Sequence, residues 1–151
     1  MAINNPIIKK RFAELQQLNE LKDRSIIENS TNSRLIIWKA AFSLIKENFW
    51  LGVGSGDVTD EMVKTYEESN FKKGQLKRYN AHNQYLQVWL AYGVFGFLVF
   101  LSGFYIFYTT SIKNDDSVYL IFLILISLVF LTETFLNSQS GVVFFSFFNS
   151  L

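Results

Sequence analysis

The only histidine of this sequence lies directly in front of its most apolar part. It stands in the stretch NAHNQYLQVWLAYGVFGF, residues 80–97, where His82 is followed by three polar side chains, Asn83, Gln84 and Gln87. A neutral imidazole can accept a proton near neutral pH, which makes His82 a candidate general base. The alternative is a histidine that only extends its ring into the lipid headgroups. The residues alone leave both interpretations open.

Charged side chains near the apolar segments are the other candidates. Arg34 stands at the predicted start of a helix, where its charge opposes the helix dipole and a bound anion would reverse that cost. Lys77 and Arg78 end the basic run KKGQLKR, residues 72–78, which can face phosphate groups. Glu133 lies in an apolar segment, where an ionisable residue is a functional candidate. An ordinary solvated or membrane-surface side chain is the alternative for each.

Composition argues against several kinds of site. The 151 residues include no cysteine and one histidine, which rules out disulfides and thiolate catalysis and makes a zinc site unexpected. The formal net charge is +1, so no overall basic field predicts nucleic-acid binding. We therefore expect no metal, no cofactor and no nucleic acid.

The charge distribution predicts an all-α integral membrane protein. Of the 14 Lys and Arg residues, all but Lys113 lie in residues 1–78, and residues 79–112 contain no charged side chain. A spanning helix needs about 20 apolar residues. We therefore expect two transmembrane helices, over residues 85–112 and 117–136. Charge does not settle their orientation, because the positive-inside rule weakens for polar segments longer than about 60 residues.

The other segments are expected to lie at the membrane surface. Residues 1–33 form a polar N-terminal segment with an amphipathic helix over 5–24. Residues 34–84 are expected to hold an interfacial helix and a loop. The Phe-rich tail, residues 137–151, breaks at Gly141 and is too short to span a membrane. It is predicted to be a re-entrant or interfacial helix.

Glycines mark a turn and a packing strip. The run GVGSG, residues 52–56, lacks the Lys-Ser/Thr continuation of a phosphate loop and is predicted to be a turn. A short helix over 57–69 is expected to follow it. Gly93 and Gly96 are three residues apart, so they lie on one side of a helix. Small residues at that spacing let another helix approach, and we expect ordinary helix packing there.

Three stretches occur together in order along the chain. SRLIIWKAAFSLIKENFWLGVGSGD joins an Arg–x₃–Trp helix to a glycine turn, and HNQYLQVWLAYGVFG joins the histidine to two glycines. The third stretch is the tail TETFLNSQSGVVFFSFFNSL. Together they resemble the O-antigen ligase and O-antigen polymerase superfamily over residues 33–151. The resemblance implies the C-terminal part of a multi-spanning, GT-C-like glycosyltransferase.

The resemblance also implies an activity. Such enzymes are inverting, metal-independent glycosyltransferases of cell-surface polysaccharide biosynthesis. They move a glycan from undecaprenyl pyrophosphate to an acceptor hydroxyl on lipid A–core of lipopolysaccharide, on a growing polysaccharide or on a protein. By this resemblance His82 is the catalytic base and Arg34 contacts the pyrophosphate. The other candidate site residues are Lys77 and Arg78 toward the pyrophosphate, and Asn83 and Glu133 as polar partners.

Location and completeness follow from the same resemblance. It places the chain in a bacterial inner membrane, with the His82 loop on the periplasmic, extracytoplasmic side. Family members carry further helices upstream, which the same protein or a partner chain would supply, so the chain alone is expected to be inactive. The alternative, from a different functional class, is a non-catalytic membrane subunit or an inactive remnant that packs or binds lipid.

Overall fold

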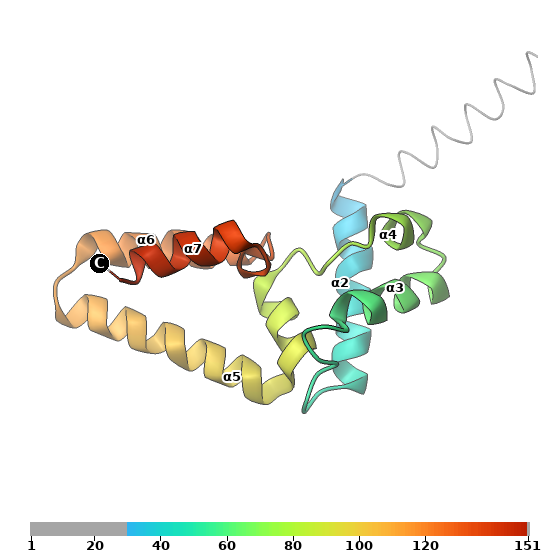
Figure 1. The fold of residues 1–151 in the computed structure, drawn as a ribbon, viewed down its shortest axis with the longest axis horizontal. Coiled ribbons are helices and arrows are strands. Elements are labelled where there is room, and N and C mark those ends of the chain that lie inside the picture. The colour runs from blue at the N-terminus through green and yellow to red at the C-terminus, as the bar shows by residue number, and fades with distance from the viewer. Residues whose placement is uncertain (1–29, 151) are drawn as a thin grey trace, which may run out of the picture. The chain divides into compact units, whose positions relative to one another are not determined.

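The computed structural model describes residues 30–150, and all regular elements in that range are helices (Figure 1). They are α2 (Ser30–Glu47), α3 (Val58–Glu68), α4 (Lys72–Lys77), α5 (Gln84–Lys113), α6 (Ser117–Phe130), the 3₁₀ turn η1 (Phe135–Asn137) and α7 (Gln139–Phe148). The all-α prediction is confirmed for this range. The helix predicted over 5–24 lies outside the described residues. Residues 1–35 and 36–151 form two units, and the contacts below lie within the second.

Helix α2, helix α3 and the start of α5 share one apolar core. On α2, Ile37, Ala41 and Leu44 recur at spacings of four and three residues and are buried, which is the pattern of an amphipathic helix. The buried residues that meet them are Val58, Met62 and Tyr66 of α3 and Leu86 and Leu90 of α5. The helix predicted over 57–69 is thereby confirmed as α3, and its inward face carries the hydrophobic residues.

Helix α5 is interrupted at Gly93. This residue has φ 65° and ψ −167°, which is not helical, and helix continues on both sides of it. The segment after α2, residues 49–54, docks at the break. Three backbone hydrogen bonds join them: Val53 N to Leu90 O (2.7 Å), Gly54 N to Ala91 O (3.1 Å) and Val94 N to Phe49 O (2.9 Å). The docked segment thus satisfies backbone groups that a break in a helix leaves open.

This contact requires glycine on both sides. Gly52 and Gly93 have φ values of 71° and 65°, in the region that side chains disfavour. A Cβ on Gly93 would overlap the Trp50 carbonyl, and a Cβ on Gly52 would overlap the backbone of α5 next to Gly93. Ordinary helix packing at Gly93 was therefore the wrong expectation. The backbone of a loop, not a second helix, approaches this glycine, and the predicted GVGSG turn is that loop.

Within the described range, α5 is the one helix long and apolar enough to cross a membrane. It extends one residue beyond each end of the span predicted over 85–112. Only 22% of its apolar window is buried inside the protein. Most of its surface is therefore left for lipid or for other helices.

Helix α6 is shorter than the second predicted span. It has 14 residues, which rise about 21 Å at 1.5 Å per residue, against a hydrocarbon core of roughly 30 Å. It ends at Phe130 rather than at residue 136, since Leu131 N and Thr132 N bond carbonyls three residues earlier and tighten the last turn. The count of two spanning helices is therefore not confirmed.

Helix α7 lies along α6 (Figure 1). The Ser138 side chain caps its first turn by accepting from Gly141 N. Phenylalanine rings then join it to its neighbours: Phe122 with Phe148 (4.6 Å between centroids) and Phe104 with Phe145 (5.9 Å). The Phe-rich tail is thus part of a packed helical layer with α6 and α5.

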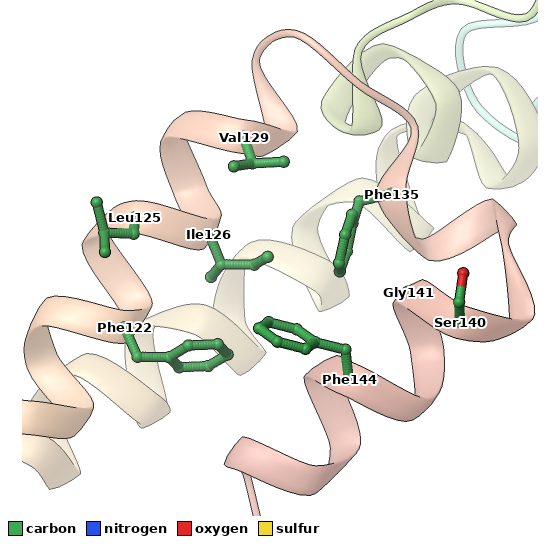
Figure 2. A pocket seen from close by; sticks show the side chains of 8 residues that line it. All are labelled: Phe122, Leu125, Ile126, Val129, Phe135, Ser140, Gly141 and Phe144. Carbon is green, nitrogen blue, oxygen red and sulfur yellow. The ribbon is translucent and has the colours of Figure 1, made fainter.

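An apolar groove separates α6 from α7 along part of their length (Figure 2). It encloses about 490 Å³ and is lined by Phe122, Leu125, Ile126, Val129, Phe135, Ser140, Gly141 and Phe144. Its surface is almost entirely hydrocarbon. It therefore offers contact area to apolar groups and few hydrogen-bonding groups.

Alanine at Gly93 or Gly52 is predicted to destabilise the fold. Each substitution adds about 1–3 kcal/mol of backbone strain and an overlap with backbone atoms that side-chain rotation does not relieve. We expect a clearly lower midpoint of thermal unfolding for Gly93→Ala and Gly52→Ala, measured by circular dichroism on the protein in detergent.

Two other glycines of the same regions provide matched controls. A Cβ at Gly56 or Gly103 would meet no atom within 4 Å. Gly56→Ala is expected to leave the midpoint unchanged, and Gly103→Ala to raise it slightly, because alanine favours a helix interior by about 1 kcal/mol. Equal midpoints for Gly93→Ala and Gly103→Ala would contradict the docking contact.

Candidate functional site

The segment that joins α4 to α5 holds His82, and the core below it fixes that segment. Trp38 Nε1 donates a hydrogen bond to Ala81 O (3.1 Å), and Tyr66 Oη donates to Tyr79 O (3.1 Å). Burial raises the pKa of the Tyr66 phenol well above its usual value, so this group stays a donor. Two side chains of the α2–α3 core thus position the backbone on the N-terminal side of the histidine.

His82 itself sits in a tight turn. Its φ of 44° is uncommon for a residue with a side chain. Its backbone N–H donates to Asn80 Oδ1 (3.0 Å), and the preceding Ala81 N–H donates to Gln87 Oε1 (3.4 Å). Asn83 then caps α5 by accepting from Leu86 N (3.0 Å). The histidine therefore lies at the first turn of the candidate membrane span.

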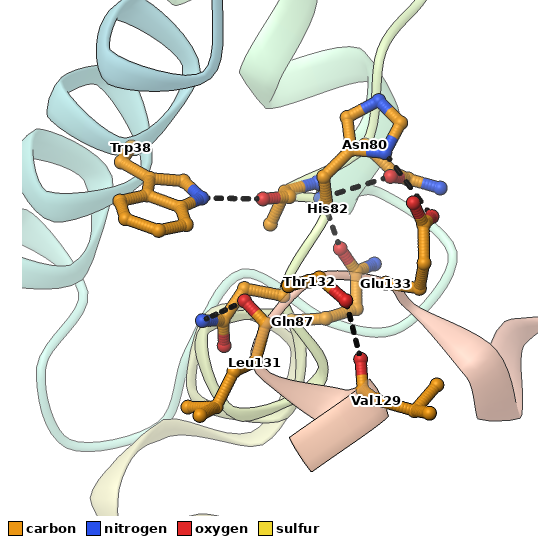
Figure 3. A network of polar contacts seen from close by, with 10 residues as sticks. Trp38, Asn80, His82, Gln87, Val129, Leu131, Thr132 and Glu133 are labelled. Atoms are coloured by element: carbon orange, nitrogen blue, oxygen red, sulfur yellow. Dashed lines mark hydrogen bonds and ion pairs between the residues drawn. The ribbon is translucent and has the colours of Figure 1, made fainter. Parts of the chain in front are cut away.

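The imidazole of His82 lies within hydrogen-bond distance of a carboxylate that is distant in the sequence (Figure 3). His82 Nδ1 lies 3.4 Å from Glu133 Oε2, which comes from the turn after α6. The two side chains are 29% and 52% exposed, so the pair is open to solvent. A carboxylate only accepts hydrogen bonds, so it favours the proton on Nδ1. Nε2 is then left with the lone pair that can accept a proton.

Three consecutive side chains at the start of α5 hold the end of α6 and the η1 turn in place. The bonds are Asn83 Nδ2 to Leu131 O (3.1 Å), Leu136 N to Gln84 Oε1 (2.8 Å) and Tyr85 Oη to Ser127 O (3.2 Å). Leu131 and Leu136 stand on either side of Glu133 in the sequence. The carboxylate is therefore positioned by backbone contacts on both of its flanks. Asn83 thus has a structural role beside the histidine.

The predicted basic candidates Lys77 and Arg78 have no hydrogen bond or ion pair with His82 within residues 30–150. Arg78 pairs with Asp60 of α3, and both side chains are exposed. Lys77 ends α4 with an exposed side chain. Asp60 was not singled out from the sequence. Its carboxylate forms an ion pair with the Arg78 guanidinium that was predicted to face a phosphate.

Arg34 lies in the second turn of α2, not in the first. The helix begins at Ser30, four residues before the predicted start. The unpaired N–H groups of a helix belong to its first four residues. The prediction that Arg34 lies in the first turn of the helix, on which the electrostatic argument for a bound anion depends, is therefore wrong. Arg34 belongs to the first unit, residues 1–35, whereas His82 and Glu133 belong to the second.

The supporting contacts of the site were not predicted from the sequence. Trp38 was noted only as part of the Arg–x₃–Trp helix, and its hydrogen bond supports the histidine segment. Gln84 and Gln87 were noted as polar side chains after His82. In the structure Gln87 supports the histidine segment, and Gln84 supports the turn that bears Glu133. No cluster of three or more His, Asp or Glu suited to a metal ion occurs within residues 30–150.

Comparison with known proteins gives one family and one relative. The family model described as O-antigen ligase matches residues 7–101, which include Arg34, the docked loop and His82. An uncharacterized protein of Haemophilus influenzae is 27% identical over 149 residues, which cover 91% of this chain and 37% of that protein. The chain thus spans little more than a third of the length of this relative. No solved structure matches. Because the family model covers more than half of the sequence, the chain belongs to the O-antigen ligase family.

Proposed function

We propose that this chain carries the proton-accepting part of a glycosyltransferase active site that builds cell-surface polysaccharide. The reaction transfers a glycan from undecaprenyl pyrophosphate to an acceptor hydroxyl. The observation that carries the proposal is the contact of His82 Nδ1 with Glu133 Oε2, which leaves Nε2 as the proton acceptor. Family membership supports the class of reaction.

The proposed chemistry is a single displacement. His82 Nε2 takes the proton of the acceptor hydroxyl while the oxygen attacks the anomeric carbon of the donor sugar. The bond to the pyrophosphate breaks, its electron pair leaves with the pyrophosphate, and the configuration at the anomeric carbon inverts. The Glu133 carboxylate stabilises the imidazolium that forms. A positioned base of this kind contributes on the order of 10²–10⁴ in rate.

Arg34 is assigned to the pyrophosphate in this proposal. A guanidinium binds phosphate oxygens through two parallel hydrogen bonds and keeps its charge at any physiological pH. The support is its place in the Arg–x₃–Trp helix within the region that the family model matches. With the leaving-group charge met by arginine, we propose that the reaction proceeds without a metal. Arg78 is left out of this role, because Asp60 already pairs with it.

The proposed setting is the outer face of a bacterial inner membrane. His82 directly precedes the helix that is long and apolar enough to span, so a lipid-linked donor and an acceptor hydroxyl on the water side can meet there. The matched part of this chain covers 37% of the relative. We therefore propose that further helices complete the donor groove and that this chain alone does not transfer glycan.

Replacement of His82 by alanine is predicted to abolish glycan transfer. The expected loss is on the order of 10²–10⁴, because the proton acceptor is removed. The measurement uses the whole protein that contains this chain, in cells that lack their own copy, with transferred glycan read by gel and the protein in the membrane fraction read by immunoblot.

The matched control for this experiment is Gln139→Ala, an exposed polar residue at the start of α7. It is expected to transfer normally. Unchanged transfer by His82→Ala at an unchanged membrane level would refute the catalytic assignment and favour a non-catalytic membrane subunit.

Replacement of Arg34 is predicted to weaken the use of the lipid-linked donor. Arg34→Ala should raise the donor KM by about tenfold or more, since hydrogen bonds to charged groups contribute about 1.5–3 kcal/mol. The donor KM of Arg34→Lys should lie between those of the unmodified protein and Arg34→Ala, because lysine keeps the charge and loses the two parallel hydrogen bonds.

Lys39→Ala removes an exposed cation from the next turn of α2 and serves as the control, with an unchanged KM expected. A donor KM unaffected by Arg34→Ala would remove Arg34 from the site.

A further inference from the structure

A second cavity is lined in part by Gln84 and Gln87, which follow His82 closely in the chain. It encloses about 450 Å³, within the range of about 300–1,000 Å³ typical of small-molecule sites. Polar side chains of the GVGSG loop, the start of α5 and the η1 turn line it, together with two aromatic rings: Ser55, Gln84, Gln87, Asn137, Tyr92 and Phe100. The chemistry proposed above assigns none of them a contact with a substrate.

Two of these side chains are buried carboxamides whose NH₂ groups donate no hydrogen bond within residues 30–150. Gln84 and Gln87 are 3% and 6% exposed. Each carboxamide oxygen accepts a backbone N–H, from Leu136 (2.8 Å) and Ala81 (3.4 Å). Because an N–H donor must face the oxygen, the NH₂ group is turned away from that contact. Within residues 30–150 neither NH₂ group donates a hydrogen bond, and neither nitrogen is sealed off from open space.

The lining selects the chemistry of the occupant. None of its residues carries a formal charge, so a charged ligand would find no counter-charge. A hydrocarbon chain would leave buried amide donors unpaired, which costs free energy. A neutral sugar fits both conditions. Its hydroxyls accept from the Gln84 and Gln87 amides and exchange hydrogen bonds with Ser55 and Asn137, while its C–H face packs against an aromatic ring.

Residues that line the cavity also form hydrogen bonds with the backbone near His82 and Glu133. Gln87 accepts from the N–H of Ala81, the residue before His82. Gln84 holds the turn in which Glu133 lies, and Asn137 ends the 3₁₀ turn that follows. The same side chains therefore line the cavity and position the catalytic pair. The contrast with the α6–α7 groove is clear, since that groove is almost entirely hydrocarbon.

We infer that this cavity is a saccharide subsite that holds a neutral sugar residue beside His82. The inference rests on the proposed function, since the sugar belongs to one of the two substrates. Its source is the glycan of the donor or the glycan of the acceptor. In either case the buried amides orient the sugar whose hydroxyl or anomeric carbon reacts.

The test measures binding on the whole protein in lipid nanodiscs by isothermal titration calorimetry. One probe is the lipid-free repeat-unit oligosaccharide released from the surface polysaccharide of the source cell, and the other is its lipid-free core oligosaccharide. Gln84→Glu and Gln87→Glu keep the acceptor oxygen for Leu136 N–H and Ala81 N–H but remove the NH₂ donors. We expect a rise in Kd of about five- to tenfold for one probe.

Two further variants protect the test against a folding defect. Ser55→Ala and Asn137→Ala shorten exposed side chains of the cavity, so the core is untouched, and each is expected to raise the same Kd about two- to fivefold. Gln139→Glu makes the same exchange on an exposed glutamine outside the cavity and should leave Kd unchanged.

The outcomes separate the inference from the proposed function. An effect on the repeat unit assigns the cavity to the polysaccharide glycan, and an effect on the core oligosaccharide assigns it to a lipopolysaccharide acceptor. No binding of either probe to the unmodified protein, or unchanged Kd values in all four cavity variants, overturns the subsite. His82→Ala should bind normally and not transfer. If it transfers while the cavity variants lose binding, the catalytic assignment fails and the subsite stands.

Discussion

The backbone contact between residues 49–54 and the break in α5 is the constraint on which the rest of the described structure depends. It divides one long apolar helix into a short first part, packed on α2 and α3, and a second part long enough to lie in lipid. Interrupted helices at membrane depth are tolerated where protein satisfies the freed backbone groups. Here three backbone hydrogen bonds do so, and the two glycines make room for them. The start of α5 can therefore bury polar side chains in protein instead of exposing them to lipid.

Those polar side chains create the site. Asn83 and Tyr85 bond the end of α6 and Gln84 bonds the η1 turn, and the segment between these contacts carries Glu133 to the imidazole of His82. The result is an open imidazole–carboxylate pair at the start of a candidate membrane span, and the same helices form an uncharged polar cavity and an apolar groove. The proposed proton transfer and sugar binding and the hydrocarbon contact thus involve three different sets of side chains on one helical framework.

Sequence patterns predicted the elements better than their ends and contacts. A run without charges located α5, and a turn signal located α3. The end of α6 was missed because apolar residues continue past Phe130, so composition does not mark the stop. The break at Gly93 was missed because a contact 40 residues away imposes its φ value. His82 and Glu133 were each singled out by type, yet their meeting depends on turn geometry that no local pattern encodes. The pairing of Arg78 with Asp60 was missed for the same reason, since Asp60 comes from another helix.

The ¹⁵N chemical shifts of the His82 imidazole test the central claim most directly. They are measured in the whole protein and assigned by comparison with His82→Gln. The account predicts a neutral ring with its proton on Nδ1 and an unprotonated Nε2, and a shift toward the other tautomer in Glu133→Ala. A neutral ring with its proton on Nε2 that does not respond to Glu133→Ala would contradict the account, because Nε2 would then be no base and Glu133 no partner.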